Sequence, residues 1–174
     1  MAQYIEEFLP PIREAGLNTQ ENATIGGTLS VAGATSLTTV AATSVAATAG
    51  LTSSGSTGTG MGYATGAGGT ITQITSRTTG VTLSKLTGYI QTDTTSLAAE
   101  AAAAFTVTNT TVAIGDTVIV SIRSGSNGGN TIAFVSTVAA GSFAITVANN
   151  NAAAGTAETG AILINFAVFK AVSA

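Results

Sequence analysis

Ionisable side chains are the first place to look for chemistry, and this chain has few of them. Its 174 residues include eight Asp or Glu and five Lys or Arg, with no Cys and no His. Their absence excludes disulfides, thiolate nucleophiles, Ser–His–Asp triads and Cys/His zinc sites. Paired carboxylates could hydrolyse glycosides, but Asp93, Glu100, Asp116 and Glu158 are scattered. We expect these four to serve turns and predict that the protein is not an enzyme.

The sequence also gives little support for binding of calcium, nucleotides or sugars. No cluster of carboxylates has the DxDxDG spacing of a calcium loop, and the glycines of 55–69 do not form GxGxxG after a strand. We therefore predict no cofactor and no metal. Arg77, Lys85, Arg123 and Lys170 are isolated, so we expect a solvated face or one ion pair. Sugar binding usually uses exposed aromatic rings, for which only Tyr63 and Tyr89 are candidates, and packing is the favoured role for both.

Charge and hydropathy also restrict the partners. Five basic residues in a chain of net charge -3 cannot form a phosphate-binding surface, so we expect no nucleic-acid partner. The longest apolar run, 161–172, is interrupted by Asn165 and Lys170 and is too short to span a bilayer. The N-terminus has acids and prolines in place of the basic start and apolar run of a signal peptide. We expect synthesis and folding in a cytoplasm, and no membrane partner.

Residues 1–21 form a first segment with bulky apolar groups beside carboxylates. Pro10 and Pro11 end any helix that begins near Gln3 and favour an extended run. A disordered terminus is one interpretation, although such tails are usually poor in large apolar residues. The alternative is an anchoring arm that docks into a groove of another protein. Its candidate contact residues are Tyr4, Ile5, Phe8, Leu9 and Ile12.

Residues 22–69 are rich in Thr, Ala and Gly and carry a sparse row of aliphatic side chains. A flexible linker is one interpretation. However, an aliphatic residue followed by Thr or Ser recurs at short intervals, which is typical of stacked β-repeats. A single chain cannot bury such a row, so we predict a shaft in which three chains associate, followed by a glycine-rich hinge. The predicted shaft contacts are Ile25, Leu29, Val31, Leu37, Val40, Val45 and Leu51.

Residues 70–174 show strand-like runs separated by turn signals, which predicts an all-β domain of the sandwich or jelly-roll type. Residues 97–104 have high helix propensity, but we favour an approach to the strand that follows. Asn127 and Gly128 predict a hairpin turn. The last run is apolar on both faces and therefore predicts a central or covered strand. The expected strands are 70–75, 81–91, 104–109, 116–123, 131–138, 142–147 and 160–172.

Two phrases within residues 62–174, TSRTTGVTLSKLTG and ETGAILINFAV, carry a family resemblance. This part resembles a domain of structural proteins from tailed bacteriophages and prophages. GGTLSVAGATSL in the predicted shaft resembles repeats in the trimeric shafts of phage fibres. Such proteins decorate capsids or form head and tail fibres, commonly as homotrimers. The resemblance supplies no functional residues.

Together these patterns predict an all-β virion protein with an extended arm, a β-repeat shaft and a sandwich or jelly-roll-like domain. The resemblance implies a head fibre or decoration protein on the capsid surface, bound to the major capsid protein. The alternative is a tail or baseplate fibre whose β-domain binds a host-surface glycan or protein. An extracellular bacterial adhesin is a third option, but it conflicts with the missing secretion signal.

Overall fold

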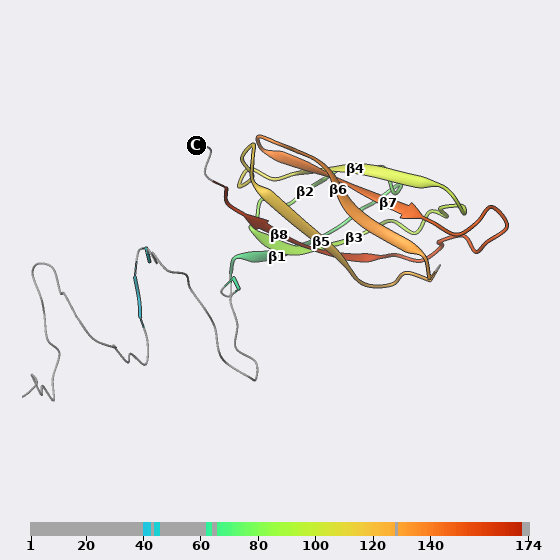
Figure 1. Cartoon of the computed structure of the whole chain (residues 1–174), viewed down its shortest axis with the longest axis horizontal. Coiled ribbons are helices and arrows are strands. Elements are labelled where there is room, and N and C mark those ends of the chain that lie inside the picture. The colour runs from blue at the N-terminus through green and yellow to red at the C-terminus, as the bar shows by residue number, and fades with distance from the viewer. Residues whose placement is uncertain (1–39, 43, 46–61, 64–65, 128, 172–174) are drawn as a thin grey trace, which may run out of the picture. The chain divides into compact units, whose positions relative to one another are not determined.

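A computed structural model of the protein describes residues 40–42, 44–45, 62–63, 66–127 and 129–171. The chain divides into two compact units, with the boundary between residues 51 and 52. Only 40–42 and 44–45 are described in the first unit, and they form no regular element. The described part of the second unit contains eight β-strands and no helix (Figure 1). The prediction of an all-β protein is therefore confirmed for the described residues.

The eight strands form two mixed sheets of four. One sheet has the order β1-β3-β8-β5 and the other has the order β2-β4-β7-β6. Pairs β1–β3 and β2–β4 are parallel, and the other pairs are antiparallel. The strands are β1 (Gly68–Thr72), β2 (Val81–Thr82), β3 (Thr87–Gln91), β4 (Ala102–Thr108), β5 (Thr117–Ser124), β6 (Thr131–Ala139), β7 (Ser142–Asn149) and β8 (Leu163–Phe169).

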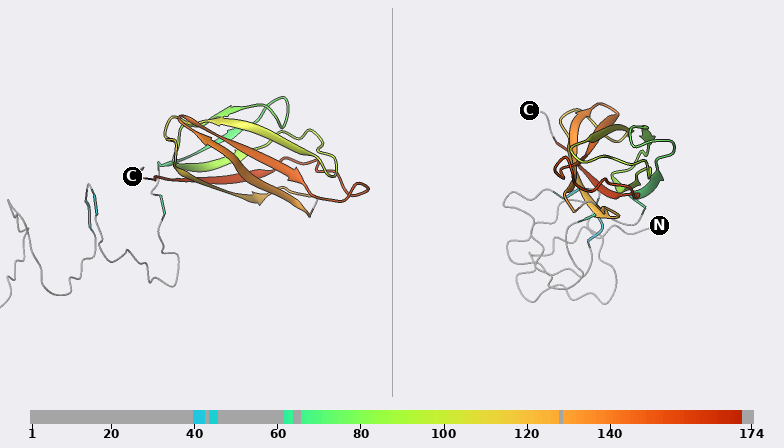
Figure 2. Two further views of the ribbon diagram at one scale, coloured as in Figure 1. Left: turned by 45° about the horizontal axis from the view of Figure 1, so that its top comes forward. Right: turned by 90° about the vertical axis from the view of Figure 1, so that its right-hand side faces the viewer.

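The sheets lie face to face with the apolar core between them (Figure 2). Buried and exposed residues alternate along β4, and β7 and β8 likewise send every second side chain into the core. The rings of Phe143 on β7 and Phe166 on β8 are tilted, with their centroids 5.5 Å apart. Since these strands belong to different sheets, this aromatic pair joins the two layers at the centre of the core.

The chain repeatedly crosses between sheets, and this changes two sequence-based predictions. Residues 81–91 form two strands in different sheets instead of one, with the crossing at 83–86. The predicted hairpin turn at 126–129 is wrong, because β5 and β6 lie in different sheets. Gly125 has a positive φ of 94° at this point, and the following residues, Ser126 and Asn127, bond to Glu158. These contacts direct the connection toward the other layer.

Other strand predictions agree with the structure. The strand interpretation of 97–104 is supported at Leu97, which forms a β-bridge with Glu158, and at Ala102, where β4 begins. Glu100 lies between them with a positive φ of 61°, so a single continuous strand does not form. β8 is paired on both sides, by β3 and β5, as its apolar sequence predicted. Its outward-facing residues, among them Asn165 and Ala167, line a groove on the outer face of this sheet.

Candidate binding groove and its supporting network

The outer face of the β1-β3-β8-β5 sheet has a groove that runs along β8. Two neighbouring hollows of 520 and 430 Å³ share Thr87 and Ala167 in their linings. We call the combined feature the β8 groove. Its outward-facing lining residues are Tyr63, Thr87, Tyr89, Ile119, Ser121, Asn165, Ala167 and Phe169. Hollows of this size fall in the range of about 300–1,000 Å³ that is usual for small-ligand sites.

Strand register explains why these side chains lie together. Asn165 pairs with Tyr89 on one side and Ser121 on the other, and Ala167 pairs with Thr87 and Ile119. Paired residues point to the same face of a sheet, so three strands contribute to one surface. The alternate residues of β8, Ile164, Phe166 and Val168, are buried in the core. Because successive side chains of a strand point to opposite faces, β8 has one face in the core and the other in the groove.

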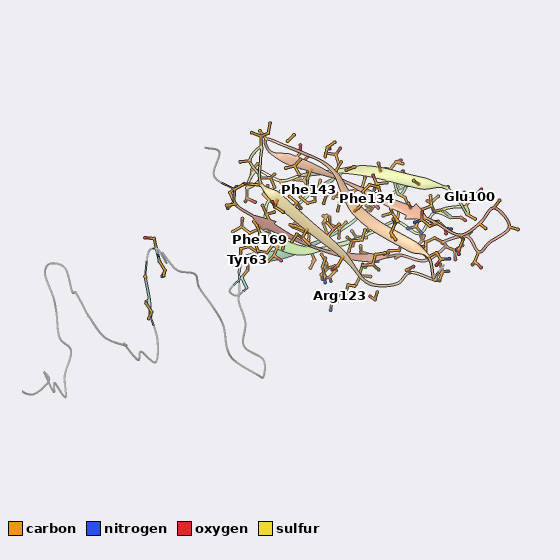
Figure 3. All side chains as sticks on the ribbon, viewed as in Figure 1. Tyr63, Glu100, Arg123, Phe134, Phe143 and Phe169 are labelled. Atoms are coloured by element: carbon orange, nitrogen blue, oxygen red, sulfur yellow. The ribbon has the colours of Figure 1, made fainter. Side chains whose placement is uncertain are left out.

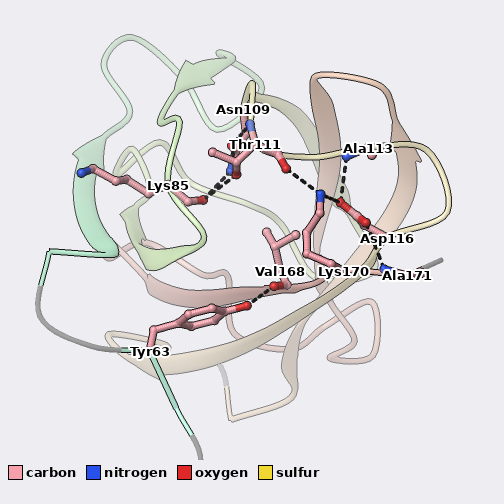
Figure 4. Close-up of polar contacts among 9 residues, drawn as sticks. All are labelled: Tyr63, Lys85, Asn109, Thr111, Ala113, Asp116, Val168, Lys170 and Ala171. Atoms are coloured by element: carbon pink, nitrogen blue, oxygen red, sulfur yellow. Dashed lines mark hydrogen bonds and ion pairs between the residues drawn. The ribbon is translucent and has the colours of Figure 1, made fainter. Parts of the chain in front are cut away.

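Two aromatic rings mark the first end of the groove. The Tyr63 and Phe169 ring centroids are 6.5 Å apart, and the two residues are 39% and 52% exposed. The Tyr63 hydroxyl donates a hydrogen bond to the backbone carbonyl of Val168 (Figure 4). In Figure 3 both labelled rings lie at the same end of the domain, and Glu100 lies at the other. Tyr63 is therefore held by one polar contact and keeps part of its ring accessible.

Tyr89 and Arg123 mark the second end. The Arg123 guanidinium carbon lies 5.2 Å from the Tyr89 ring centroid, which is within cation–π range. Arg123 is the extra residue of a bulge in β5, since Ile122 pairs with Ile164 and Ser124 pairs with Leu163. Bulges redirect side chains, and here the exposed Arg123 side chain lies over the tyrosine. It forms no ion pair with any described carboxylate.

Small and polar residues lie between these ends. Gly88 has a φ of 156°, and a Cβ there would overlap the backbone carbonyl of Gly69 on the parallel strand β1, so the pairing of β1 with β3 requires glycine at this position. Thr87 donates its hydroxyl to the Phe166 carbonyl at 2.9 Å, which fixes its side chain against β8. The Ser121 hydroxyl and the exposed Asn165 amide form no hydrogen bond within the described chain. They are available to an outside partner.

A second polar cluster lies in the loops, and there the sequence-based expectation was wrong. Arg77 is buried instead of solvated, and Glu158 is fully buried instead of serving an exposed turn. Glu158 accepts bonds from Ser126 Oγ, Asn127 N and Thr131 Oγ1 at 2.9, 3.0 and 2.6 Å. Burial lowers the pKa of Arg77, and the nearby Glu158 and Asp93 charges oppose that change. The hydrogen bonds of Arg77 and Glu158 hold the connecting loops together.

Asp116 and Lys170 form the ion pair expected for one of the cations (Figure 4). The Asp116 carboxylate also accepts the backbone N–H groups of Ala113 and Ala171, at 2.8 and 3.2 Å. These N–H bonds, that of Ala113 first, and the Lys170 ammonium lower the pKa of Asp116 below its ordinary value. The pair ties the end of β8 to the loop before β5.

Most residues predicted to contact the capsid or other copies of the chain lie outside the described residues: Tyr4, Ile5, Phe8, Leu9 and Ile12 of the arm, and Ile25, Leu29, Val31, Leu37 and Leu51 of the shaft. Val40 and Val45 are described and are 60% and 67% exposed. The groove itself was not predicted, although Tyr63 and Tyr89 had been considered for sugar binding. Alternation along β8 would have placed Asn165 and Phe169 on one face.

Comparisons of the chain with protein-family models, with curated proteins and with solved structures found no match. Within the described residues, no group of three or more Asp or Glu is placed to hold a metal ion. The same part of the chain contains no helix that is long and apolar enough to cross a membrane.

Proposed function

We propose that the protein is a non-enzymatic structural component of a tailed-phage particle, a head fibre or decoration protein on the capsid surface. The observation that carries this proposal is the exposure of Val40 and Val45 in a segment without charged residues. Exposed apolar side chains in a repeating segment are stabilised when copies of that segment associate. We infer a homotrimer, with the row from Ile25 to Leu51 at the contact between chains.

The polar interior of the β-domain supports a structural role. Every buried side-chain nitrogen and oxygen in the described residues has a hydrogen-bond partner. The buried Arg77 donates to backbone carbonyls, so its charge holds loops together. A fully satisfied polar network makes a fold rigid and well specified. These properties suit an outward β-domain of the sandwich or jelly-roll kind.

In this proposal the arm formed by residues 1–21 attaches the protein to the major capsid protein. Tyr4, Ile5, Phe8, Leu9 and Ile12 supply apolar contacts, and Glu6 and Glu7 supply charges at the rim. Buried aromatic contacts usually dominate binding free energy, at about 2 kcal/mol or more each, whereas exposed ion pairs contribute about 0–1 kcal/mol. Phe8→Ala should therefore weaken sedimentation with undecorated capsids more than Glu6→Gln combined with Glu7→Gln.

The second candidate is a tail or baseplate fibre protein that binds a host-surface glycan or protein. The β8 groove favours it, because partly exposed aromatic rings at both ends suit recognition of an external molecule. Electron microscopy of particles labelled with antibody against residues 62–174 distinguishes the two candidates. Label on the head supports the decoration role, label on the tail supports the fibre role, and particles without label rule out both.

A further inference from the structure

We propose that the β8 groove binds a short acidic oligosaccharide, whose sugar rings stack on Tyr89 and the Tyr63–Phe169 pair and whose carboxylate bonds to Arg123. Such a site would specify the glycan of the second candidate above, but it does not depend on where the protein sits in a particle. The shape, the side-chain chemistry and the charge of the groove support it.

The groove has the dimensions of a short extended ligand. Asn165, which pairs with Tyr89, and Phe169 are four residues apart on β8. At about 3.3 Å per residue, the two aromatic ends are separated by about 13 Å. Between them the floor consists of small or polar side chains, with Ile119 on β5 along one side. A flat ligand that is longer than one ring can therefore lie along β8.

The groove lining combines aromatic rings with short polar side chains, which is the combination that contacts sugars. Sugar rings present apolar C–H faces and hydroxyl edges, so aromatic rings and short polar side chains contact them together. The Ser121 hydroxyl and the Asn165 amide have no partner in the described chain and face this groove. A purely apolar partner would leave these two polar groups without hydrogen bonds, at a free-energy cost.

The charge of the groove selects an anion. Arg123 lies at the groove over Tyr89, and the described lining residues include no carboxylate. A guanidinium presents five N–H donors in a planar fork that fits a carboxylate with two parallel bonds. Its present contact with the Tyr89 ring face uses none of these donors in a hydrogen bond. Arg123 and Tyr89 together therefore offer an anion site beside a partly exposed aromatic ring.

The test uses the full-length protein on an array of immobilised oligosaccharides that includes uronic-acid, sialic-acid and neutral members. We expect binding to acidic members, weaker at higher salt because the Arg123 pair is exposed. Calorimetric titration with the best acidic oligosaccharide and its methyl ester then isolates the charge. We expect Arg123→Gln to weaken binding of the acid about tenfold or more, in line with a lost charged hydrogen bond, and to leave the ester unchanged.

Two further variants locate the site. Tyr89→Ala should weaken binding of both the acid and the ester, whereas Phe134→Ala should change neither. Phe134 is a matched control, since it is an aromatic residue that is 44% exposed on β6 of the other sheet. Circular dichroism melts show whether each variant is folded, and Arg123→Gln tests the site independently if Tyr89→Ala unfolds.

Three results would overturn the proposal. The first is failure of the folded protein to bind any acidic member of the array. The second is equal loss of acid and ester binding in Arg123→Gln. The third is dissociation of an oligomer by Tyr89→Ala in light scattering, because the groove would then be covered by a second copy of the chain. None of these results bears on attachment to a capsid, so the two proposals fail separately.

Discussion

Arg77 donates a hydrogen bond from one guanidinium nitrogen to the backbone carbonyl of Gly160 at 2.7 Å, across 83 residues of sequence. Other nitrogens of the same side chain donate to Thr92 Oγ1 and to the carbonyl of Thr95. One buried cation thus connects the loop after β1, the loop after β3 and the loop before β8. These bonds hold the three loops together around one buried side chain.

Removing this fork should strongly destabilise the protein. We expect Arg77→Met to lower the free energy of unfolding by about 3 kcal/mol or more, as for other buried charged groups that lose a partner. The free energy of unfolding of Arg77→Lys should lie between those of the parent and Arg77→Met, because an ammonium has fewer donors and lacks the planar fork. Urea denaturation measures these changes, with Lys85→Met as control, since the Lys85 ammonium makes one exposed bond to Gly66. Equal stability of Arg77→Lys and the parent would show that the fork geometry is unnecessary.

Asp116 should make stability depend on acid. Its pKa is lowered in the folded protein by the Ala113 N–H first and then by Lys170. A lowered folded-state pKa stabilises the protein above the unfolded value of about 3.9, and that contribution is lost as the pH falls through the folded-state pKa. Thermal melts of the parent should therefore shift downward below about pH 4. Asp116→Asn should melt lower at pH 7 and show a smaller decline.

Glu100→Gln is the matched control for this measurement. It removes one carboxylate from an exposed position at which no side-chain hydrogen bond forms within the described chain. Asp93, whose pKa is lowered by hydrogen bonds from Thr95, remains in the parent and in Asp116→Asn. The fall of the melting temperature in acid should therefore be reduced in Asp116→Asn and not abolished. An unchanged acid profile in Asp116→Asn would show that other carboxylates set it.

Gly125 tests the crossing between the two sheets. Its φ is 94°, and a Cβ there would overlap the carbonyl oxygen of Ala161. Gly141, in the turn between β6 and β7, has a φ of 77° but open space around it. Gly125→Ala should therefore cost more than Gly141→Ala, in which only the backbone strain of about 1 kcal/mol applies. Similar unfolding midpoints in urea would mean that the crossing can relax away from Ala161.

The sequence predicted the all-β class and the central position of β8 because alternation and paired apolar faces depend on local composition. It did not predict which strands pair, since β5 and β6 are joined by an Asn-Gly turn signal and still enter different sheets. The connection is held by Glu158, which bonds to Ser126 and Asn127 from 32 and 31 residues away. The groove was not predicted for the same reason. Tyr89 and Arg123 lie close together because of the register of β3, β8 and β5 and the bulge in β5, and none of these can be read from local sequence.

The predicted shaft should make the protein a trimer. Light scattering of the full-length protein should give about three times the 16.9 kDa chain mass, because a single chain leaves Val40 and Val45 exposed. Val40→Asp combined with Val45→Asp should shift the protein toward monomer, since each carboxylate would lose its hydration in a contact between chains. Ile74→Asp is the control, because Ile74 is 73% exposed in the β-domain and lies outside the predicted shaft. A monomeric parent at micromolar concentration would refute the trimeric shaft, and a trimeric double variant would place the contact elsewhere in the chain.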